Sequence, residues 1–384
     1  MNKIPLCVPY LTGLEKQYVN DSIKSGWVSS VGPQVDQFET DFSKFIGSTK
    51  SVALSSGTAA IHLSLILSGI KESDEVIVPS LTFIAPVNCI KYVGANPIFI
   101  DVDYATGQID IDILKKFIQQ NTKYKNNKLV NKITGNVIKA ILPVHILGYS
   151  ANIDEIIAIA KRFDLKVIED ATESLGTKFK DKSVGTYGDF GCFSFNGNKL
   201  ITTGSGGMLV SNSLKDIEKA KHLSTQAKSH PVEYIHDNTG YNYRLSNISA
   251  AFGIAQLENI NNFIDKKNEI HAHYSKNLEI IDGIEFFEKN TISNCVVWLN
   301  TIKIDSKKYG INSRELMKIL NDNNIETRPL WQPLHKSTIY SDYYYYGSDN
   351  SEKLFLNCLS IPSSVGLSLE QQNKVIKAIK KNAK

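Results

Sequence analysis

Short apolar runs rich in β-branched residues alternate with helical patterns over the first two thirds of the chain. The clearest unit predicts a strand at 137–142, a helix at about 152–163 and a second strand at 166–170. Asn152 and Glu155 have the spacing of a capping box at the start of that helix. A strand, a helix and a strand in this order predict a right-handed βαβ unit and therefore a parallel sheet.

Further apolar segments extend this sheet, and the pattern changes character near residue 256. The added strands are predicted at 51–54, 75–79, 97–102 and 208–210. Beyond residue 256 we predict a long helical stretch, a strand and two more helices, at 257–278, 295–304, 314–323 and 369–379. The fold class is therefore α/β, with a large domain at 1–255 that holds a mixed, mostly parallel sheet between helices. A smaller α+β domain is predicted at 256–384, and the Lys- and Asn-rich segment 119–136 is predicted to be a solvated insertion.

Composition narrows the function classes. Of the 384 residues, 42% are hydrophobic and 21% are charged, which excludes general disorder. The net charge of +4 is too small to indicate binding to a nucleic acid or an anionic membrane. The five cysteines lie far apart without a CxxC pair, so we expect no metal site and a reducing cytoplasmic location. The N-terminus shows no signal-peptide pattern, and the uncharged run 51–70 is too polar for a membrane span.

Three segments could carry chemistry. Gly57 and Thr58 follow two serines between a predicted strand and a predicted helix, where backbone N–H groups can bind an anion or form an ordinary N-cap. Asp170 ends a buried strand, so it is either a helix cap or a ligand group at the carboxyl edge of the sheet. Lys199 lies within the glycine-rich segment 185–207 and could form a Schiff base with an aldehyde.

Together these segments supply what pyridoxal phosphate requires: a phosphate cradle, a strand-end carboxylate and a reactive lysine. The carboxylate would keep the pyridine nitrogen of the cofactor protonated, so that the ring can accept electrons. At about 4 Å and an effective dielectric constant near 20, that pairing is worth on the order of 4 kcal/mol.

The chain resembles the DegT/DnrJ/EryC1/StrS family of nucleotide-sugar aminotransferases. The resemblance extends over nearly the whole chain, in motif segments that occur in order at 25–29, 56–60, 78–83, 143–148, 169–171, 193–199, 240–244, 327–335 and 359–362. It implies a fold type I pyridoxal phosphate enzyme that works as a homodimer with a shared active site.

The resemblance also implies roles for individual residues. Lys199 would hold the cofactor as a Schiff base and later transfer the proton, and Asp170 would pair with the pyridinium nitrogen. The other implied cofactor contacts are Phe83 on the ring, Gly57, Thr58 and Ser194 on the phosphate, Asn242 on the phosphate of the neighbouring subunit, and Glu173 on the phenolic oxygen. Glu173 departs from the Gln or His that most of the family has there.

The resemblance is strongest to the branch that aminates C4 of 4-keto-6-deoxy sugars, which includes enzymes of the legionaminic acid, bacillosamine and perosamine pathways. We therefore expect glutamate as the amino donor and a nucleotide-linked keto sugar as the acceptor, in amino-sugar and surface-glycan biosynthesis. Amination at C3 and a non-catalytic homologue that has kept the fold are the alternatives. Dehydration at C3 is disfavoured, because the related dehydratase has a His in place of Lys199.

Arginine is scarce, with four residues against 39 lysines, so each one is informative. Arg244 and Arg328 fall in family motif segments, and one or both could meet the carboxylate of the donor or the diphosphate of the nucleotide. His335 and Trp27 lie in nearby motifs and are further candidates for substrate binding. A structural salt bridge at the dimer interface explains the two arginines equally well.

Overall fold

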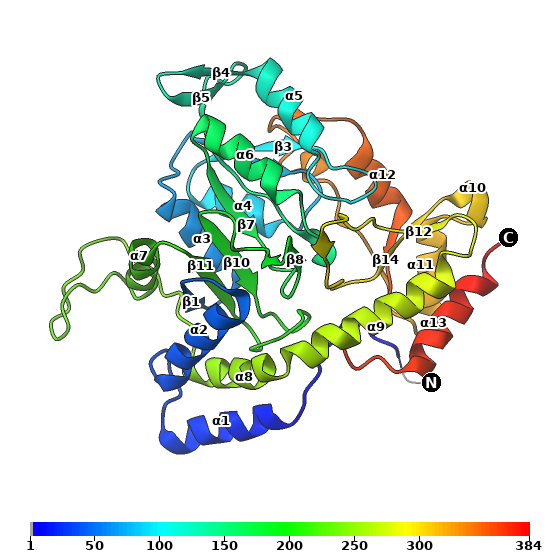
Figure 1. The fold of residues 1–384 in the computed structure, drawn as a ribbon, viewed down its shortest axis with the longest axis horizontal. Helices are drawn as coiled ribbons and strands as arrows, with labels where there is room; N and C mark the ends of the chain where they lie inside the picture. The colour runs from blue at the N-terminus through cyan, green and yellow to red at the C-terminus, as the bar shows by residue number, and fades with distance from the viewer. Residues whose placement is uncertain (1–2) are drawn as a thin grey trace.

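A ten-stranded sheet runs through the larger part of the computed structural model, which describes residues 3–384 (Figure 1). The strand order is β1-β11-β10-β7-β6-β2-β3-β16, and the β4–β5 hairpin is attached to β6. The strands from β10 to β16 pair in parallel, whereas β11 runs antiparallel to both of its neighbours. These strands are β1 (Lys50–Leu54), β2 (Glu75–Pro79), β3 (Asn96–Ile100), β6 (Val137–Ile141), β7 (Lys166–Asp170), β10 (Phe190–Ser194), β11 (Gly207–Ser211) and β16 (Tyr345–Tyr346). The predicted α/β fold with a mixed, mostly parallel sheet is confirmed.

Helices cover both faces of this sheet, which explains why its strands are apolar on both sides. In β2, Val76 and Val78 pack into one core and Ile77 into the other, as the alternation of side chains along a strand requires. One face carries α3 (Gly57–Leu67), α4 (Ala85–Tyr92) and α7 (Leu214–Ser224). The other carries α2 (Pro33–Ile46), α5 (Ile111–Asn121), α6 (Ile153–Phe163) and α8 (Asn247–Glu258), with α1 (Leu14–Ser25) packed on α8.

A second, four-stranded sheet follows the long helix α9 (Ile260–Leu278) and has its own core. Its elements are β12 (Ile284–Phe286), β14 (Thr301–Ile304), β15 (Arg328–Pro329), β17 (Cys358–Ser360), α10 (Ser306–Tyr309), α11 (Ser313–Asp322) and α13 (Leu369–Lys381). Ile4 packs into this smaller core, whereas β16 pairs with β3 of the large sheet. The helix α12 (Asn350–Asn357) packs on α11 and β14, and the N–H of Ser351 donates to Asp101 just beyond β3. Chain from both sides of residue 255 thus contributes to each part, and the boundary at 255/256 stays a prediction.

The structure departs from some of the local predictions. The segment 119–136 is largely exposed, as predicted, but it contains the antiparallel hairpin of β4 (Thr122–Lys125) and β5 (Lys128–Asn131), and β5 also pairs with β6. Its buried residues are interleaved with exposed lysines and asparagines, which conceal the strand pattern. The side chain of Asn152 forms no capping hydrogen bond at α6. Its ψ of 76° lies outside the extended region that capping residues such as Ser56 (ψ 162°) adopt.

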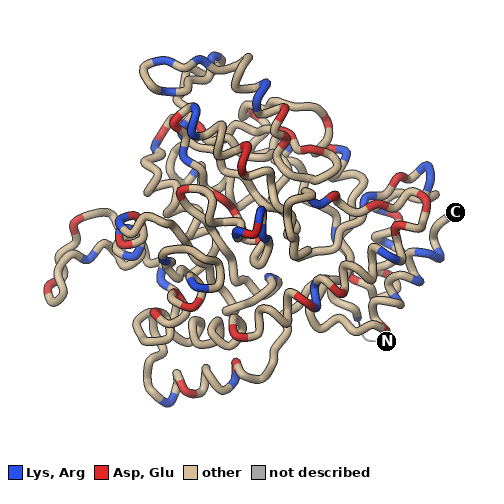
Figure 2. The backbone as a smooth tube through the Cα atoms, in the orientation of Figure 1, with Lys and Arg blue, Asp and Glu red and all other residues tan. Residues whose placement is uncertain are grey.

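Basic and acidic residues are interspersed along the whole backbone rather than gathered on one side (Figure 2). No helix in residues 3–384 is both long enough and apolar enough to cross a membrane. The segment between α7 and α8 projects from the body of the molecule (Figure 1), and its side chains include the strongly exposed Val232 and Tyr234.

Candidate active site

A cavity of about 370 Å³ lies at the carboxyl ends of β7 and β10, beside the N-terminus of α3. This is the edge of a parallel sheet at which ligands bind in open α/β folds. The structure brings together here the side chains or backbone of seven predicted site residues, namely Gly57, Thr58, Phe83, Asp170, Glu173, Ser194 and Lys199.

The N-terminus of α3 forms one wall and offers unpaired backbone donors. Ser56 is the N-cap, and its Oγ accepts a hydrogen bond from the N–H of Ala59 at 3.0 Å. The N–H groups of Gly57 and Thr58 precede the first intrahelical bond and donate to no group within residues 3–384. A Cβ on Gly207 would stand 2.5 Å from the nitrogen of Gly57, so the cradle requires glycine behind it. Such a wall fits a phosphate group.

Asp170, the last residue of β7, is a buried carboxylate that faces the same cavity. Its Oδ1 accepts a hydrogen bond from the N–H of Thr172 at 3.0 Å. No Lys, Arg or His among the described residues forms an ion pair with it, and burial raises the pKa of the Asp170 carboxyl. A buried carboxylate without an ion-pair partner fits the protonated ring nitrogen of pyridoxal phosphate.

Glu169, whose side chain is completely buried, fixes the loop behind Asp170. Its carboxylate accepts hydrogen bonds from the N–H groups of Tyr187 and Gly188, both at 2.7 Å, and of Gly185 at 2.8 Å. His145 Nδ1 accepts the N–H of Ala151 at 3.1 Å, so the ring proton lies on Nε2, which donates to Glu169 at 3.1 Å. Glu169 and His145 thus support the end of β7 from outside the cavity lining.

Lys199 projects into the cavity and is almost buried. Its Nζ lies 3.5 Å from Oε1 of Glu173 and 4.0 Å from the centre of the Trp298 ring. The other carboxylate oxygen of Glu173 accepts the N–H of Leu147 at 2.8 Å, and burial raises the pKa of the Glu173 carboxyl while nearby Lys199 opposes that rise. The sequence did not indicate a site role for Trp298, which falls in a predicted apolar strand. Trp331 also lines the cavity.

The structure does not bring Asn242, Arg244 or Trp27 to the cavity of this chain. Asn242 is exposed, its backbone bridges to Thr225 just after α7, and Trp27 is 47% exposed. The backbone of Arg244 bridges to Leu54, and its half-buried guanidinium has no hydrogen-bond or ion-pair partner within residues 3–384.

Arg328 and His335 also lie outside the cavity lining. Arg328 is largely exposed and forms an ion pair with Glu326 at 2.8 Å. His335 is buried and stacks on Tyr345, with ring centres 3.8 Å apart and an interplanar angle of 12°. Its Nε2 lies 3.5 Å from the carboxylate of Glu352.

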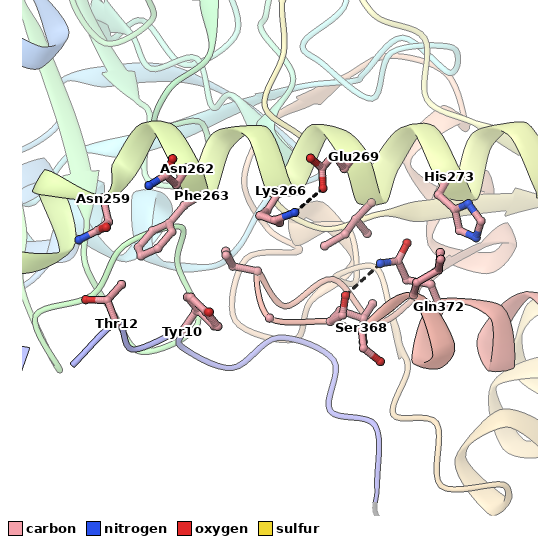
Figure 3. Close-up of a pocket in the computed structure, with 15 residues that line it drawn as sticks. Tyr10, Thr12, Asn259, Asn262, Phe263, Lys266, Glu269, His273, Ser368 and Gln372 are labelled. Carbon is pink, nitrogen blue, oxygen red and sulfur yellow. Dashed lines mark hydrogen bonds and ion pairs between the residues drawn. The ribbon is translucent and has the colours of Figure 1, made fainter. Parts of the chain in front are cut away.

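A larger cavity, of about 760 Å³, lies between α9, α13 and the N-terminal segment around Tyr10 (Figure 3). Lys266 and Glu269 form an ion pair across one side of it at 2.6 Å, and Tyr10 meets Phe263 edge to face. It holds none of the predicted site residues. The chemistry-bearing groups are therefore gathered in the smaller cavity.

Known proteins match both the chain and the fold. The model of the DegT/DnrJ/EryC1/StrS aminotransferase family matches residues 9–380. GDP-perosamine synthase of Escherichia coli O157:H7 is 40% identical over 371 residues, covering 97% of this chain and 96% of that protein. The putative pyridoxal phosphate-dependent aminotransferase EpsN of Bacillus subtilis (strain 168) is 38% identical over 381 residues, covering 98% and 95%. The crystal structure of a DegT DnrJ EryC1 StrS aminotransferase from Brucella abortus superposes with a TM-score of 0.87 at 27% identity, covering 96% and 95%.

The family match is consistent with the site, because a phosphate cradle, a buried carboxylate and a lysine line one cavity. The chain therefore belongs to the DegT/DnrJ/EryC1/StrS aminotransferase family, and it is a pyridoxal phosphate-dependent enzyme.

Proposed function

We propose that the enzyme transfers the amino group of glutamate to the C4 keto group of a nucleotide-linked 4-keto-6-deoxy sugar. The observation that carries the transfer chemistry is the convergence of Lys199, Asp170 and the unpaired N–H groups of Gly57 and Thr58 on one cavity. The similarity to GDP-perosamine synthase supports a nucleotide-linked amino sugar as the product. The resemblance to the C4-aminating branch supports the position of amination.

Pyridoxal phosphate supplies an aldehyde that condenses with amines and a ring that accepts electrons from a C–H bond beside nitrogen. The residues of the chain divide the remaining work. The N–H groups of Gly57 and Thr58 and the hydroxyl of Ser194 would bind the phosphate, and the Asp170 carboxylate would hold the proton on the ring nitrogen. Phe83, 54% exposed beside the cavity, would contact the ring.

Lys199 is the proton carrier in this proposal. Its Nζ would hold the cofactor through the aldehyde carbon. When free, Nζ would accept the proton from Cα of the donor and later release it, so Lys199 would act first as a base and then as an acid. Glu173, 3.5 Å from Nζ, provides a carboxylate for the cationic amine while it is free.

We further propose a homodimer in which Asn242 of each subunit reaches the phosphate site of the other. The exposure of Asn242 and of the apolar side chains of Val232 and Tyr234 on the same projecting segment supports a partner there. Arg244 and Arg328, with guanidinium groups that are not buried, remain the candidates for binding the donor carboxylate or the diphosphate. Substrate roles for His335 and Trp27 would likewise require the second subunit or a rearrangement on binding.

Two experiments test the proposal. Borohydride reduction of the purified holoenzyme followed by peptide mass spectrometry should place a pyridoxyl group on Lys199, with Lys199→Ala as the control that gains none. A label on another residue, or no label, would refute the assignment of Lys199. The holoenzyme supplied with glutamate and a nucleotide-linked 4-keto-6-deoxy sugar should then yield a 4-amino sugar by NMR. A 3-amino product from the 3-keto isomer alone would refute C4 specificity.

A further inference from the structure

The amine of Lys199 contacts the face of the Trp298 ring within the cavity. Its Nζ lies 4.0 Å from the ring centre, and the Glu173 carboxylate lies 3.5 Å away. A cation over an aromatic face is attracted by the ring quadrupole, and indole gives the strongest such attraction among the side chains. The free amine therefore has a defined resting position between a ring and a carboxylate.

Hydrogen bonds to both the side chain and the backbone of Trp298 fix its position. Its indole N–H donates to the carbonyl of Asn198 at 2.7 Å, and its backbone N–H donates to the carbonyl of Leu147 at 2.9 Å. The buried ammonium of Lys267 donates to the Trp298 carbonyl at 2.7 Å. Only 5% of Trp298 is exposed, so its ring cannot rotate away without breaking the indole hydrogen bond and displacing its neighbours.

The same contacts fix the backbone next to the reactive side chain. The carbonyl of Asn198, which precedes Lys199, accepts the indole N–H of Trp298 and also the thiol of Cys7 at 3.1 Å. Segments far apart in the sequence thus hold both ends of Lys199, the backbone through Asn198 and the amine through the Trp298 ring.

We propose that Trp298 is a positioning residue that stabilises Lys199 whenever its amine is free. This inference rests on the proposed function, in which Lys199 alternates between a covalent link to the cofactor and a free amine. Contact with Trp298 would favour the free-amine states, because in this proposal Nζ gives up that contact when it is linked to the cofactor. Trp298 would thereby assist the donor amine in displacing Lys199.

The proposal predicts that loss of the Trp298 contact changes the affinity for only one of the two forms of the cofactor. Lys199 would stay free when pyridoxamine phosphate binds, so loss of the Trp298 contact would affect the apoenzyme and the complex equally. The affinity for pyridoxamine phosphate would then be unchanged. Binding of pyridoxal phosphate would end the contact of the amine with Trp298, so loss of that contact would increase the affinity for pyridoxal phosphate. Ligand binding can shift a state only by its differential interaction with the two states.

The test is equilibrium binding of both cofactor forms to apoenzyme of the wild type, Trp298→Leu and Trp298→Phe. Trp298→Leu should raise the affinity for pyridoxal phosphate relative to pyridoxamine phosphate by about 3- to 30-fold. Trp298→Phe, which keeps a weaker ring but loses the indole N–H, should give a smaller shift in the same direction. Trp331→Leu, which changes a tryptophan of the same cavity that forms no cation–π pair with Lys199 within residues 3–384, should leave the ratio unchanged.

Equal weakening of both affinities by Trp298→Leu, or an unchanged ratio, would overturn the proposal and assign Trp298 a purely structural role. If Trp298→Leu fails to fold, the ratio measured for Trp298→Phe decides in the same way. A wild-type enzyme that forms no covalent link at Lys199 would instead refute the proposed function, because the ratio has meaning only when Lys199 binds the aldehyde.

Discussion

Replacing Glu169 by Gln should weaken both the fold and the cofactor site. The carboxylate of Glu169 accepts four hydrogen bonds without contact with solvent, three from backbone N–H groups and one from His145. An amide offers one oxygen acceptor, and its NH₂ group would face two of the four donors. At about 1–3 kcal/mol for each buried donor left unpaired, the free energy of unfolding should fall by about 2–6 kcal/mol.

Urea unfolding of the apoenzyme followed by circular dichroism measures this loss. Glu155→Gln is the matched control, because Glu155 forms an exposed ion pair with Lys115 and should contribute little to stability. Glu169→Gln should also weaken the binding of pyridoxal phosphate, since the residue next to Glu169 is Asp170. A loss below about 1 kcal/mol would contradict the reasoning, because it would mean that the buried donors find other acceptors.

Three further predictions concern the cavity and its support. Burial raises the pKa of Asp170, so the wild-type apoenzyme loses stability as pH rises from the unfolded to the folded pKa. Asp170→Asn should therefore raise the melting temperature of the apoenzyme at pH 7 while lowering kcat by about 100- to 1,000-fold. A Cβ at Gly207 would stand 2.5 Å from the nitrogen of Gly57. Gly207→Ala should therefore weaken binding of pyridoxal phosphate at least about tenfold without affecting pyridoxal comparably, whereas Gly197→Ala, which meets open space, should not. Burial lowers the pKa of Lys267 below its ordinary value of 10.5, so the wild type should gain urea stability relative to Lys267→Met as the pH rises from the folded to the unfolded pKa, and a flat difference would contradict this.

The parts of the site that sequence could predict are those with a local chemical signature. Asp170 ends a short strand that begins at Lys166, and β7 has the predicted bounds of 166–170. Gly57 and Thr58 follow a capping serine, and Lys199 stands among glycines. In each case the neighbours along the chain determine the local backbone, so the pattern predicts the geometry.

Other features depend on contacts between distant segments and carry no local signature. Trp298 lies 100 residues from the carbonyl that its indole contacts, and in sequence it looks like any apolar core residue. His335 belongs to a motif segment, yet it stacks on Tyr345 rather than lining the cavity. In the β4–β5 hairpin, exposed lysines concealed the alternation that the buried Leu129 would otherwise reveal.

The convergence of Cys7, Asp170, Trp298 and Trp331 around Lys199 has a consequence for biosynthesis. Synthesis proceeds from the N-terminus, so a growing chain exposes Lys199 well before Trp298 and Trp331 are available to surround it. Contacts that span so much sequence close late in folding. The cavity therefore becomes able to select pyridoxal phosphate only once the chain is nearly complete, and until then Lys199 is an ordinary lysine among 39. Incomplete chains should consequently show no preference for Lys199 over their other lysines in reaction with the cofactor.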